Sequence, residues 1–212
     1  MPTNSERLAY WNRWHARHGE TERSERNEGH ADLLAEFVAA LEPGPVVELG
    51  CGRGLDASAI ASAGHVVHGL DVASEAVRRL PANVRGLVHD TAEPLPFGDE
   101  EMAGVYSHLA LHYFDDRTTR RVFAEIRRIT RPGGVLGFAV KSTSDRLWGR
   151  GSLVEPDMFD LEGHVRHFFS REYLTDLLTG WHVRFVREYR GCYAGGDQTD
   201  SFISAVAVRR PD

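Results

Sequence analysis

The sequence predicts an α/β fold built on a doubly wound, mostly parallel β-sheet. Five short apolar segments alternate with segments of helical periodicity, which is the pattern of repeated strand–helix–strand units. Two further apolar segments, 181–189 and 202–208, close the chain and are joined by a loop rich in Gly, Asp and Gln. We therefore expect an antiparallel hairpin at one edge of an otherwise parallel sheet.

The first strand ends in a glycine-rich loop that indicates a ligand site. The apolar run 46–49 is followed by glycines at three alternate positions, Gly50, Gly52 and Gly54, and residues 55–63 have helical spacing. Glycine has no Cβ, so the chain can turn tightly there and a ligand can approach the backbone. The free N–H groups at the start of the helix then lie beside the carboxyl end of the strand, where ligands of open α/β sheets bind.

The next elements repeat this strand–helix pattern. The helix at 55–63 is expected to bury one face, formed by Leu55, Ala59 and Ile60. Residues 65–71 form the second predicted strand, which ends in an acid, Asp71. Ser74 is expected to cap a helix that extends to residue 80. The third strand, 84–89, is followed by another acid, Asp90.

The second half of the chain supplies the remaining elements. Residues 102–109 form a fourth strand, and Asp115 or Asp116 opens a helix with four core positions, Val122, Phe123, Ile126 and Ile129. A Pro-Gly-Gly turn then leads into a fifth strand, 135–140. Ser170 has the pattern of a helix cap, with the helix extending to about residue 179.

Length and composition predict one main domain, 31–212, preceded by an N-terminal helical cap, 1–30, and containing a substrate-side insertion, 142–169. A chain of 212 residues that is 42% hydrophobic can bury one substantial core. The net charge of −6 and the lack of a basic stripe disfavour a nucleic-acid partner. No apolar run approaches the roughly 18 residues of a membrane helix, so we expect a cytoplasmic protein with no membrane partner.

Two classes of ligand fit the glycine loop. Residues 52–57 match the G-x-G-x-x-G/A dinucleotide pattern, with Asp71 about 20 residues further on to bind a ribose. Glu48 points to the other class, because a carboxylate at this turn suits a cofactor that carries an amine or a positive charge and would repel a pyrophosphate.

The motif E-x-G-x-G-x-G at 48–54, followed by an acid at the end of the next strand, resembles that of the class I methyltransferases that use S-adenosylmethionine. The resemblance extends from about residue 31 to 209. It implies a Rossmann-like sheet of seven strands in the order 3-2-1-4-5-7-6, with the last strand reversed. Within that class, residues 54–57 and 63–65 are similar to the tellurite and thiopurine methyltransferase-like group.

The resemblance also implies which residues hold the cofactor, S-adenosylmethionine. Asp71 would bind the ribose hydroxyls and Asp90 would meet the adenine amine. Two aromatic residues of the cap, Tyr10 and Trp14, would close over the site. The expected cofactor-binding set is completed by Glu48, Gly50, Cys51, Gly52, Gly54, Val72, Thr91, Ala92 and Ser107.

The chemistry implied is an in-line displacement, which needs a base only when the methyl acceptor arrives protonated. His108 and His112 follow the fourth strand and are candidates for that base. Lys141, the only lysine in the chain, is expected to face the pocket from the end of the fifth strand. Three histidine pairs have a spacing of three or four residues, but none lies in an HExxH pattern or beside a cysteine, so we expect no metal.

The sequence thus predicts a methyltransferase that acts on an O, N or S atom of a small molecule. The arginines and aromatic residues of the insertion favour a small planar or anionic acceptor, and secondary metabolism is a working assignment. An NAD(P)-dependent oxidoreductase and a non-catalytic S-adenosylmethionine-binding protein are the alternatives. The protein is expected to be a monomer or a homodimer.

Overall fold

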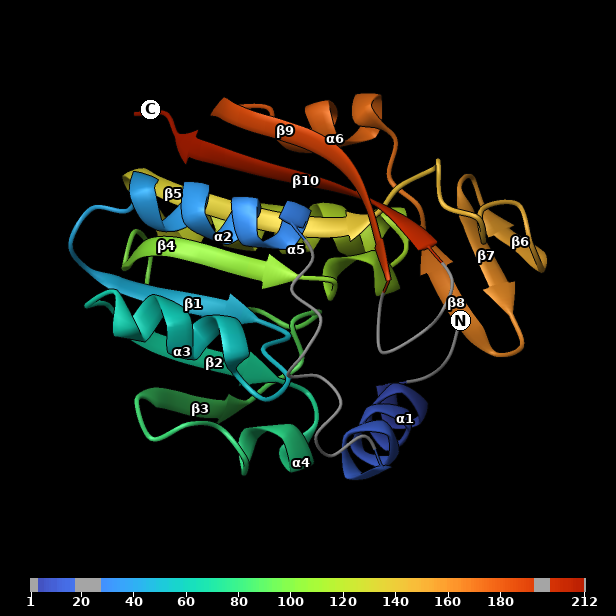
Figure 1. Ribbon diagram of the computed structural model, residues 1–212, viewed down its shortest axis with the longest axis horizontal. Coiled ribbons are helices and arrows are strands. Elements are labelled where there is room, and N and C mark those ends of the chain that lie inside the picture. The colour runs from blue at the N-terminus through green and yellow to red at the C-terminus, as the bar shows by residue number, and fades with distance from the viewer. Residues whose placement is uncertain (1–3, 18–27, 193–198, 212) are drawn as a thin grey trace.

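The computed structural model describes residues 4–17, 28–192 and 199–211, and its centre is a seven-stranded sheet (Figure 1). The strands lie in the order β3 (Val84–Val88), β2 (Val66–Asp71), β1 (Pro45–Leu49), β4 (Met102–His108), β5 (Thr130–Lys141), β10 (Thr199–Arg209) and β9 (Trp181–Cys192). Numbered within this sheet alone, the order is 3-2-1-4-5-7-6. β10 runs antiparallel to both of its neighbours, and the other pairs are parallel, so the predicted α/β architecture is confirmed.

Helices cover both faces of this sheet. Side chains of α2 (Glu28–Ala40) and α3 (Leu55–Ser62) pack on one face, and those of α5 (Asp116–Ile129) and α6 (Arg171–Leu177) pack on the other. Neighbouring residues of β1 point to opposite faces, so Val46 packs with the first helix pair and Val47 with the second. A strand that is buried on both faces explains the continuous apolar run that marked β1 in the sequence.

The helix caps agree with the sequence in two cases and differ in a third. Asp115 caps α5 by accepting a hydrogen bond from the N–H of Thr118, and Ser170 caps α6. The prediction for Ser74 was wrong: α4 spans only Ser74–Val77 and its N-cap residue is Ala73. The side chain of Asn12, on α1 (Asn4–Arg17), takes that role instead, because its Oδ1 accepts from the N–H of Glu75 at 3.2 Å.

The buried face of α3 also differs from the prediction. Asp56, Ala57 and Ile60 are its buried residues, whereas Leu55 is 37% exposed. Leu55 is the first residue of the helix, and it lies at the rim of the pocket described below instead of under the helix. The sequence spacing located the helix correctly but assigned its first residue to the wrong side.

The segment 142–169 contains a second, small sheet that the sequence analysis did not predict. Its antiparallel strands are β6 (Ser152–Glu155), β7 (Met158–Leu161) and β8 (His164–His167). In Figure 1 this sheet lies beyond the end of the main sheet toward which β1 and β4 point, the same end as α1. A short 3-10 helix, η2 (Leu111–Tyr113), packs against β8.

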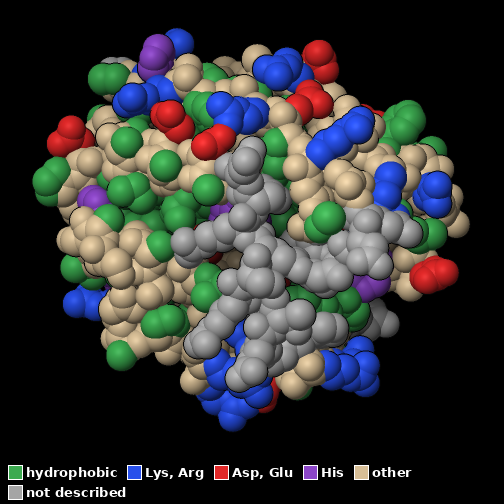
Figure 2. Space-filling model, viewed as in Figure 1, with side chains coloured by type: hydrophobic (Ala, Val, Ile, Leu, Met, Phe, Trp, Pro, Cys, Tyr) green, Lys and Arg blue, Asp and Glu red, His purple; other side chains and the backbone are tan. Residues whose placement is uncertain are grey.

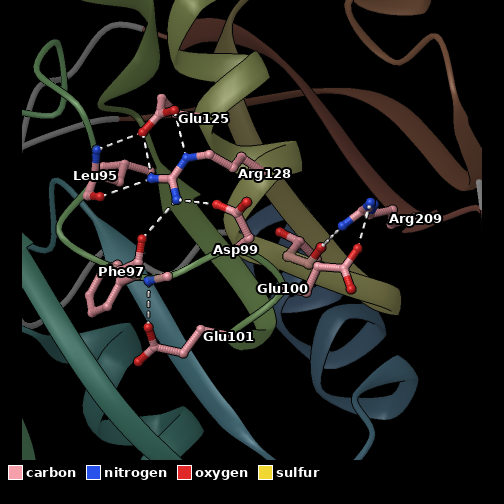
Figure 3. Close-up of polar contacts among 10 residues, drawn as sticks. Leu95, Phe97, Asp99, Glu100, Glu101, Glu125, Arg128 and Arg209 are labelled. Carbon is pink, nitrogen blue, oxygen red and sulfur yellow. Dashed lines mark hydrogen bonds and ion pairs between the residues drawn. The ribbon is translucent and has the colours of Figure 1, made fainter.

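At the opposite end of β4, the loop before that strand is fixed by one arginine of α5 (Figure 3). The Arg128 guanidinium donates to the carbonyl oxygens of Leu95 and Phe97 and pairs with Asp99 and Glu125. The carboxylate of Glu125 also accepts from the N–H of Leu95 at 2.8 Å. We refer to these five residues as the Arg128 network. Beside it, Arg209 of β10 pairs with Glu100.

The N-terminal cap and the main domain are not separated at the expected position. The expected boundary at residue 30 falls inside α2, and most of the charged stretch before it lies outside the described residues.

In the described part of the chain, no helix is long and apolar enough to cross a membrane. Figure 2 shows basic side chains around the rim of one face, interspersed with acidic ones along its upper part.

Candidate functional site

A pocket lies at the carboxyl ends of β1 to β4, between the glycine loop, α1 and η2. Ten of the predicted site residues line it: Trp14, Glu48, Gly50, Cys51, Gly52, Asp71, Val72, Asp90, Thr91 and His108. These residues come from five separate segments of the chain. The strand ends of a parallel sheet bring them together, as the sequence analysis expected.

The glycine loop takes a backbone conformation that other residues rarely adopt. Gly50, Gly52 and Gly54 have φ values of 67°, 51° and 71°. A Cβ on Gly50 would lie 2.2 Å from the Cβ of Ala110, so the loop also makes a close approach to the segment after β4. The loop is thus held against η2 in a shape that only glycine permits.

Two buried carboxylates tie the glycine loop to the elements around it. Glu48 is 3% exposed, and its Oε2 accepts from the N–H of Ala57 in the first turn of α3 at 2.8 Å. Asp71 accepts from the N–H groups of Gly52 and Ala73, both at 2.8 Å. Burial raises the pKa of Asp71, while these two hydrogen bonds oppose the shift. Each carboxylate oxygen can accept a further bond from a ligand hydroxyl or amine.

Asp90 and Cys51 are the other two polar residues beside the glycine loop. Asp90 follows β3, and its Oδ1 accepts from the N–H of Ala92 at 3.0 Å. Burial, assisted by the charges of Glu48 and Asp71, raises the pKa of the Cys51 thiol well above its usual range. Cys51 is therefore a neutral thiol that packs in the loop and is a poor nucleophile.

Four predicted cofactor-binding residues lie outside the pocket lining: Gly54, Ala92, Ser107 and Tyr10. Gly54 is the N-cap of α3, and the N–H of Ala92 donates to the Asp90 carboxylate in the turn after β3. Ser107 is fully buried and donates its hydroxyl to the carbonyl of Leu49 at 2.8 Å, so it joins β4 to β1. Tyr10 packs edge-on against His164 of β8, with 4.4 Å between ring centroids.

The expectation that Lys141 faces the pocket was wrong. It is 5% exposed, and its ammonium lies 3.0 Å from Asp145 and 2.9 Å from Asp200. The Asp145 carboxylate also accepts from the N–H of Ser201. Lys141 therefore anchors the start of the 142–169 insertion to β10 and does not line the pocket.

The two candidate histidines, His108 at the end of β4 and His112 in η2, occupy different surroundings. His112 lies in η2, is 1% exposed and does not line the pocket. Burial and the charge of Lys141 hold the pKa of His112 well below its usual range. His108 does line the pocket, and its ring stacks on that of His30, with 3.7 Å between centroids and 7° between planes.

Helix α1 forms an aromatic wall of the pocket. Trp11 and Trp14 line it, and Trp11 packs edge-on against Tyr113 of η2 at 5.0 Å. The carbonyl of His15, near the end of this helix, accepts from the guanidinium groups of Arg53 and Arg79. These bonds and the Asn12 contact attach α1 to the glycine loop and α4.

The prediction missed several pocket residues. His30 belongs to a charged stretch with no motif, so no sequence signal marked it. Asp56 was visible as the second residue after the last glycine, where it lies in the first turn of α3, and that position could have indicated it. Tyr113 and Phe114 follow His112 directly. They line the pocket because η2 packs against α1, and the sequence does not reveal that contact.

Comparison with known proteins supports the assignment of this site. The profile of the methyltransferase domain family matches residues 46–134. An uncharacterized methyltransferase from Synechocystis is 34% identical over 99 residues, 45% of this chain and 47% of the relative. A malonyl-[acyl-carrier protein] O-methyltransferase from Hamiltonella defensa is 27% identical over 155 residues, 70% of this chain and 57% of the relative. The chain thus spans about half the length of the curated relatives it matches.

A solved structure extends the similarity to nearly the whole fold. The 1,6-didemethyltoxoflavin-N1-methyltransferase of Burkholderia thailandensis, solved with S-adenosylhomocysteine and 1,6-didemethyltoxoflavin, superimposes with a TM-score of 0.72 at 18% identity. The match covers 98% of this chain and 87% of the other. Nothing in these comparisons supports the NAD(P)-dependent alternative. The matched residues 46–134 are similar to the methyltransferase domain family, and the whole chain has the fold of S-adenosylmethionine-dependent methyltransferases.

Proposed function

We propose that this protein transfers the methyl group of S-adenosylmethionine to an O, N or S atom of a small molecule. The observation that carries the proposal is the row of polar groups along the carboxyl ends of neighbouring strands. Asp71, Glu48 and His108 lie in the last residues of β2, β1 and β4, Asp90 follows β3, and all four line one pocket. The row offers polar groups for a nucleoside that is joined to an amino acid.

The strand order gives the bound cofactor a direction. With the adenine near Asp90 and the ribose at Asp71, the sulfonium end lies toward β1 and β4. Glu48 supplies negative charge on that side, and the left-handed glycines let the cofactor approach the backbone. The cofactor supplies an electrophilic methyl group, so the task of the protein is to align the acceptor and exclude water.

The acceptor would lie against the aromatic wall. Trp11, Trp14 and Tyr113 line the pocket, and Trp11 packs against Tyr113 in the segment after β4, which favours a small planar molecule. The Burkholderia neighbour binds 1,6-didemethyltoxoflavin, which is consistent with this size of acceptor. His108 is the one candidate base from the sequence analysis that lines the pocket. We also propose that the protein is related to the tellurite and thiopurine methyltransferase-like group and acts in secondary metabolism. It would work in the cytoplasm as a monomer or a homodimer.

Calorimetric titration with S-adenosylmethionine, S-adenosylhomocysteine and NADH tests the cofactor part of the proposal. We expect micromolar binding of the first two ligands and none of NADH. Asp71→Ala should weaken both by about 1–3 kcal/mol, because the ribose loses a charged acceptor. Glu36→Ala, at an exposed site on α2, is the matched control and should bind as the wild type does. Unchanged affinity in Asp71→Ala would contradict the proposed orientation.

A further inference from the structure

One arginine of the insertion has no carboxylate partner. Arg166 belongs to β8 and is half-buried. None of the ion pairs among the described residues joins it to an acid. By contrast, Arg146 of the same insertion pairs with Asp200 at 3.1 Å. A guanidinium that is partly removed from water and has no counter-ion in the protein is suited to bind an anion.

The side chain of Arg166 lies on the face of β8 that is turned toward α1, and both elements lie at the same end of the main sheet (Figure 1). Alternate residues of a strand share a face, so Arg166 is on the same side as His164. The ring of His164 packs edge-on against Tyr10 of α1, with 4.4 Å between centroids. Asp160 of β7 pairs with Val165 and therefore lies on the other face. Arg166 thus points to α1 and away from this acid.

The charge of Arg166 acts on three aromatic rings of this region. Burial raises the pKa values of Tyr10 and Tyr113 and lowers that of His164. The positive charge of Arg166 is the next largest influence on all three groups, since it opposes the rise at the tyrosines and adds to the fall at the histidine. Because such influences weaken with distance, the guanidinium lies close to all three rings. They come from α1, η2 and β8, so Arg166 lies where these elements meet.

Tyr113 connects this position to the pocket. It lines the pocket beside Trp11, and the two ring centroids are 5.0 Å apart. Burial raises the pKa of Tyr113 to about 12, so its hydroxyl is neutral and can donate a hydrogen bond. Arg166 is not part of the pocket lining. Its positive charge therefore lies behind the aromatic wall, on the side of the small sheet.

The charges around the pocket are divided between its two sides. The acids in the lining belong to β1, α3, β2 and the turn after β3: Glu48, Asp56, Asp71 and Asp90. No acid of the lining comes from α1 or from the segment after β4, which form the aromatic wall. Arg53, the one arginine in the lining, donates to the carbonyl of His15. A negatively charged molecule is therefore repelled by the acidic side and attracted to the aromatic wall.

We propose that the methyl acceptor is a planar molecule with a negative charge, such as an aromatic carboxylate, and that Arg166 selects it. This inference rests on the proposed function and narrows its substrate class. The acceptor ring packs against Trp11 and Tyr113, and the anionic group lies on the Tyr113 side. There the Tyr113 hydroxyl donates to it, and Arg166 supplies the opposite charge. Arg166 determines specificity and takes no part in the methyl transfer, so its loss should change the choice of acceptor and leave cofactor binding intact.

The test compares aromatic carboxylates with their neutral amides on the protein saturated with S-adenosylhomocysteine. The pairs are benzoate and benzamide, salicylate and salicylamide, and indole-3-acetate and indole-3-acetamide. They are titrated by calorimetry at about pH 7.5, where the carboxylates are ionised. In the wild type we expect at least one carboxylate to bind about tenfold more tightly than its amide, because a charge-assisted hydrogen bond is stronger than a neutral one.

Four variants assign this preference to residues. Arg166→Gln should remove the preference while the amide binds as before, whereas a structural defect would weaken the binding of both molecules. Arg166→Lys keeps the charge and should retain part of the preference. Tyr113→Phe removes the hydroxyl and should reduce the preference several-fold. Arg150→Gln, at an exposed position of the same insertion, is the matched control and should keep the wild-type preference.

A panel in which no carboxylate binds more tightly than its amide would overturn the inference, as would a preference that persists in Arg166→Gln. The wild-type comparison needs no variant and can overturn it alone. Titration with S-adenosylhomocysteine comes first and separates the two proposals. Failure of this ligand to bind would overturn the proposed function, and the inference with it.

Discussion

The two ends of β4 differ in how their polar groups are satisfied. At the start of the strand, the carbonyls of Leu95 and Phe97 and the carboxylates of Asp99 and Glu125 all accept from donors of the Arg128 network (Figure 3). At the end of the strand, the glycine loop has left-handed backbone at three positions. There, Nδ1 of His112 is buried with no hydrogen-bond partner among the described residues.

The difference separates a region built for stability from one built for binding. Buried groups that already have partners lower the free energy of the fold and have little left to offer a ligand. Left-handed glycines leave backbone open to a ligand, and buried polar atoms without partners cost stability; both features are typical of places where a ligand is held. Substitutions at the start of β4 and at the pocket should therefore affect different measurements, as the following predictions describe.

The largest effect is expected at Lys141. Its charged neighbours already have ion-pair partners, as those of the Arg128 network do. Lys141→Met leaves the buried Asp145 carboxylate without its cation, while Asp200 keeps its pair with Arg146, so the free energy of unfolding should fall by about 3 kcal/mol. Urea denaturation measures this loss. Arg184→Ala, at an exposed position on β9, should change it by less than about 0.5 kcal/mol. A stable Lys141→Met protein that still bound ligand but lost methyl transfer would restore the catalytic role that the structure does not support.

Gly50→Ala should affect both stability and binding. The left-handed backbone costs a residue with a Cβ about 1–2 kcal/mol, and contact with Ala110 forces the loop to move. We expect at least a tenfold loss of affinity for S-adenosylhomocysteine, measured by calorimetry. Gly133→Ala is the matched control, because it also has positive φ but no atom within 4 Å of the added Cβ. That variant should lose stability alone; equal losses of binding in both variants would argue against a specific role of the loop.

Arg128→Ala should give the opposite pattern from Gly50→Ala. Its side chain is 31% exposed, so the loss of its hydrogen bonds and ion pairs should cost about 1–2 kcal/mol of unfolding free energy. Affinity for S-adenosylhomocysteine should not change, because the network lies at the far end of the strand. Arg121→Ala, on the exposed side of the same helix, is the comparison. A loss of affinity in Arg128→Ala would show that the two ends of β4 are coupled.

The smallest effect concerns the pH dependence of stability at His112. Its pKa is lowered in the folded protein, so below about pH 6.5 the unfolded chain binds a proton that the folded one does not. Stability should therefore fall as the pH falls below that value. His112→Gln should reduce this slope by at most about 1.4 kcal/mol per pH unit. His68, His164 and His167 also have lowered pKa values, so a residual slope is expected. An unaltered slope would mean that His112 is not buried as described.

Sequence patterns predicted the framework well because the signals were local. The apolar run 46–49 and the core positions of α5 are buried as expected, since burial repeats with the period of each element. The acids at the ends of β1 and β2 could be placed for the same reason. The small sheet at 152–167 was missed because its strands are only four residues long and most of their residues are exposed or half-buried, so they carry no alternating pattern.

The sequence by itself determined the α/β class, the strand order through its resemblance to a known family, and the position of the glycine loop with Glu48, Asp71 and Asp90. These follow from residue types at fixed spacing, because hydrophobic periodicity and glycine conformations act over a few residues. Only the tertiary structure decided that Lys141 turns to Asp145 and Asp200, that Asn12 caps α4, and that His30 meets Asp56 and His108. Each of these contacts joins segments whose meeting depends on how the whole chain packs, and side chains with the same local sequence could have found other partners.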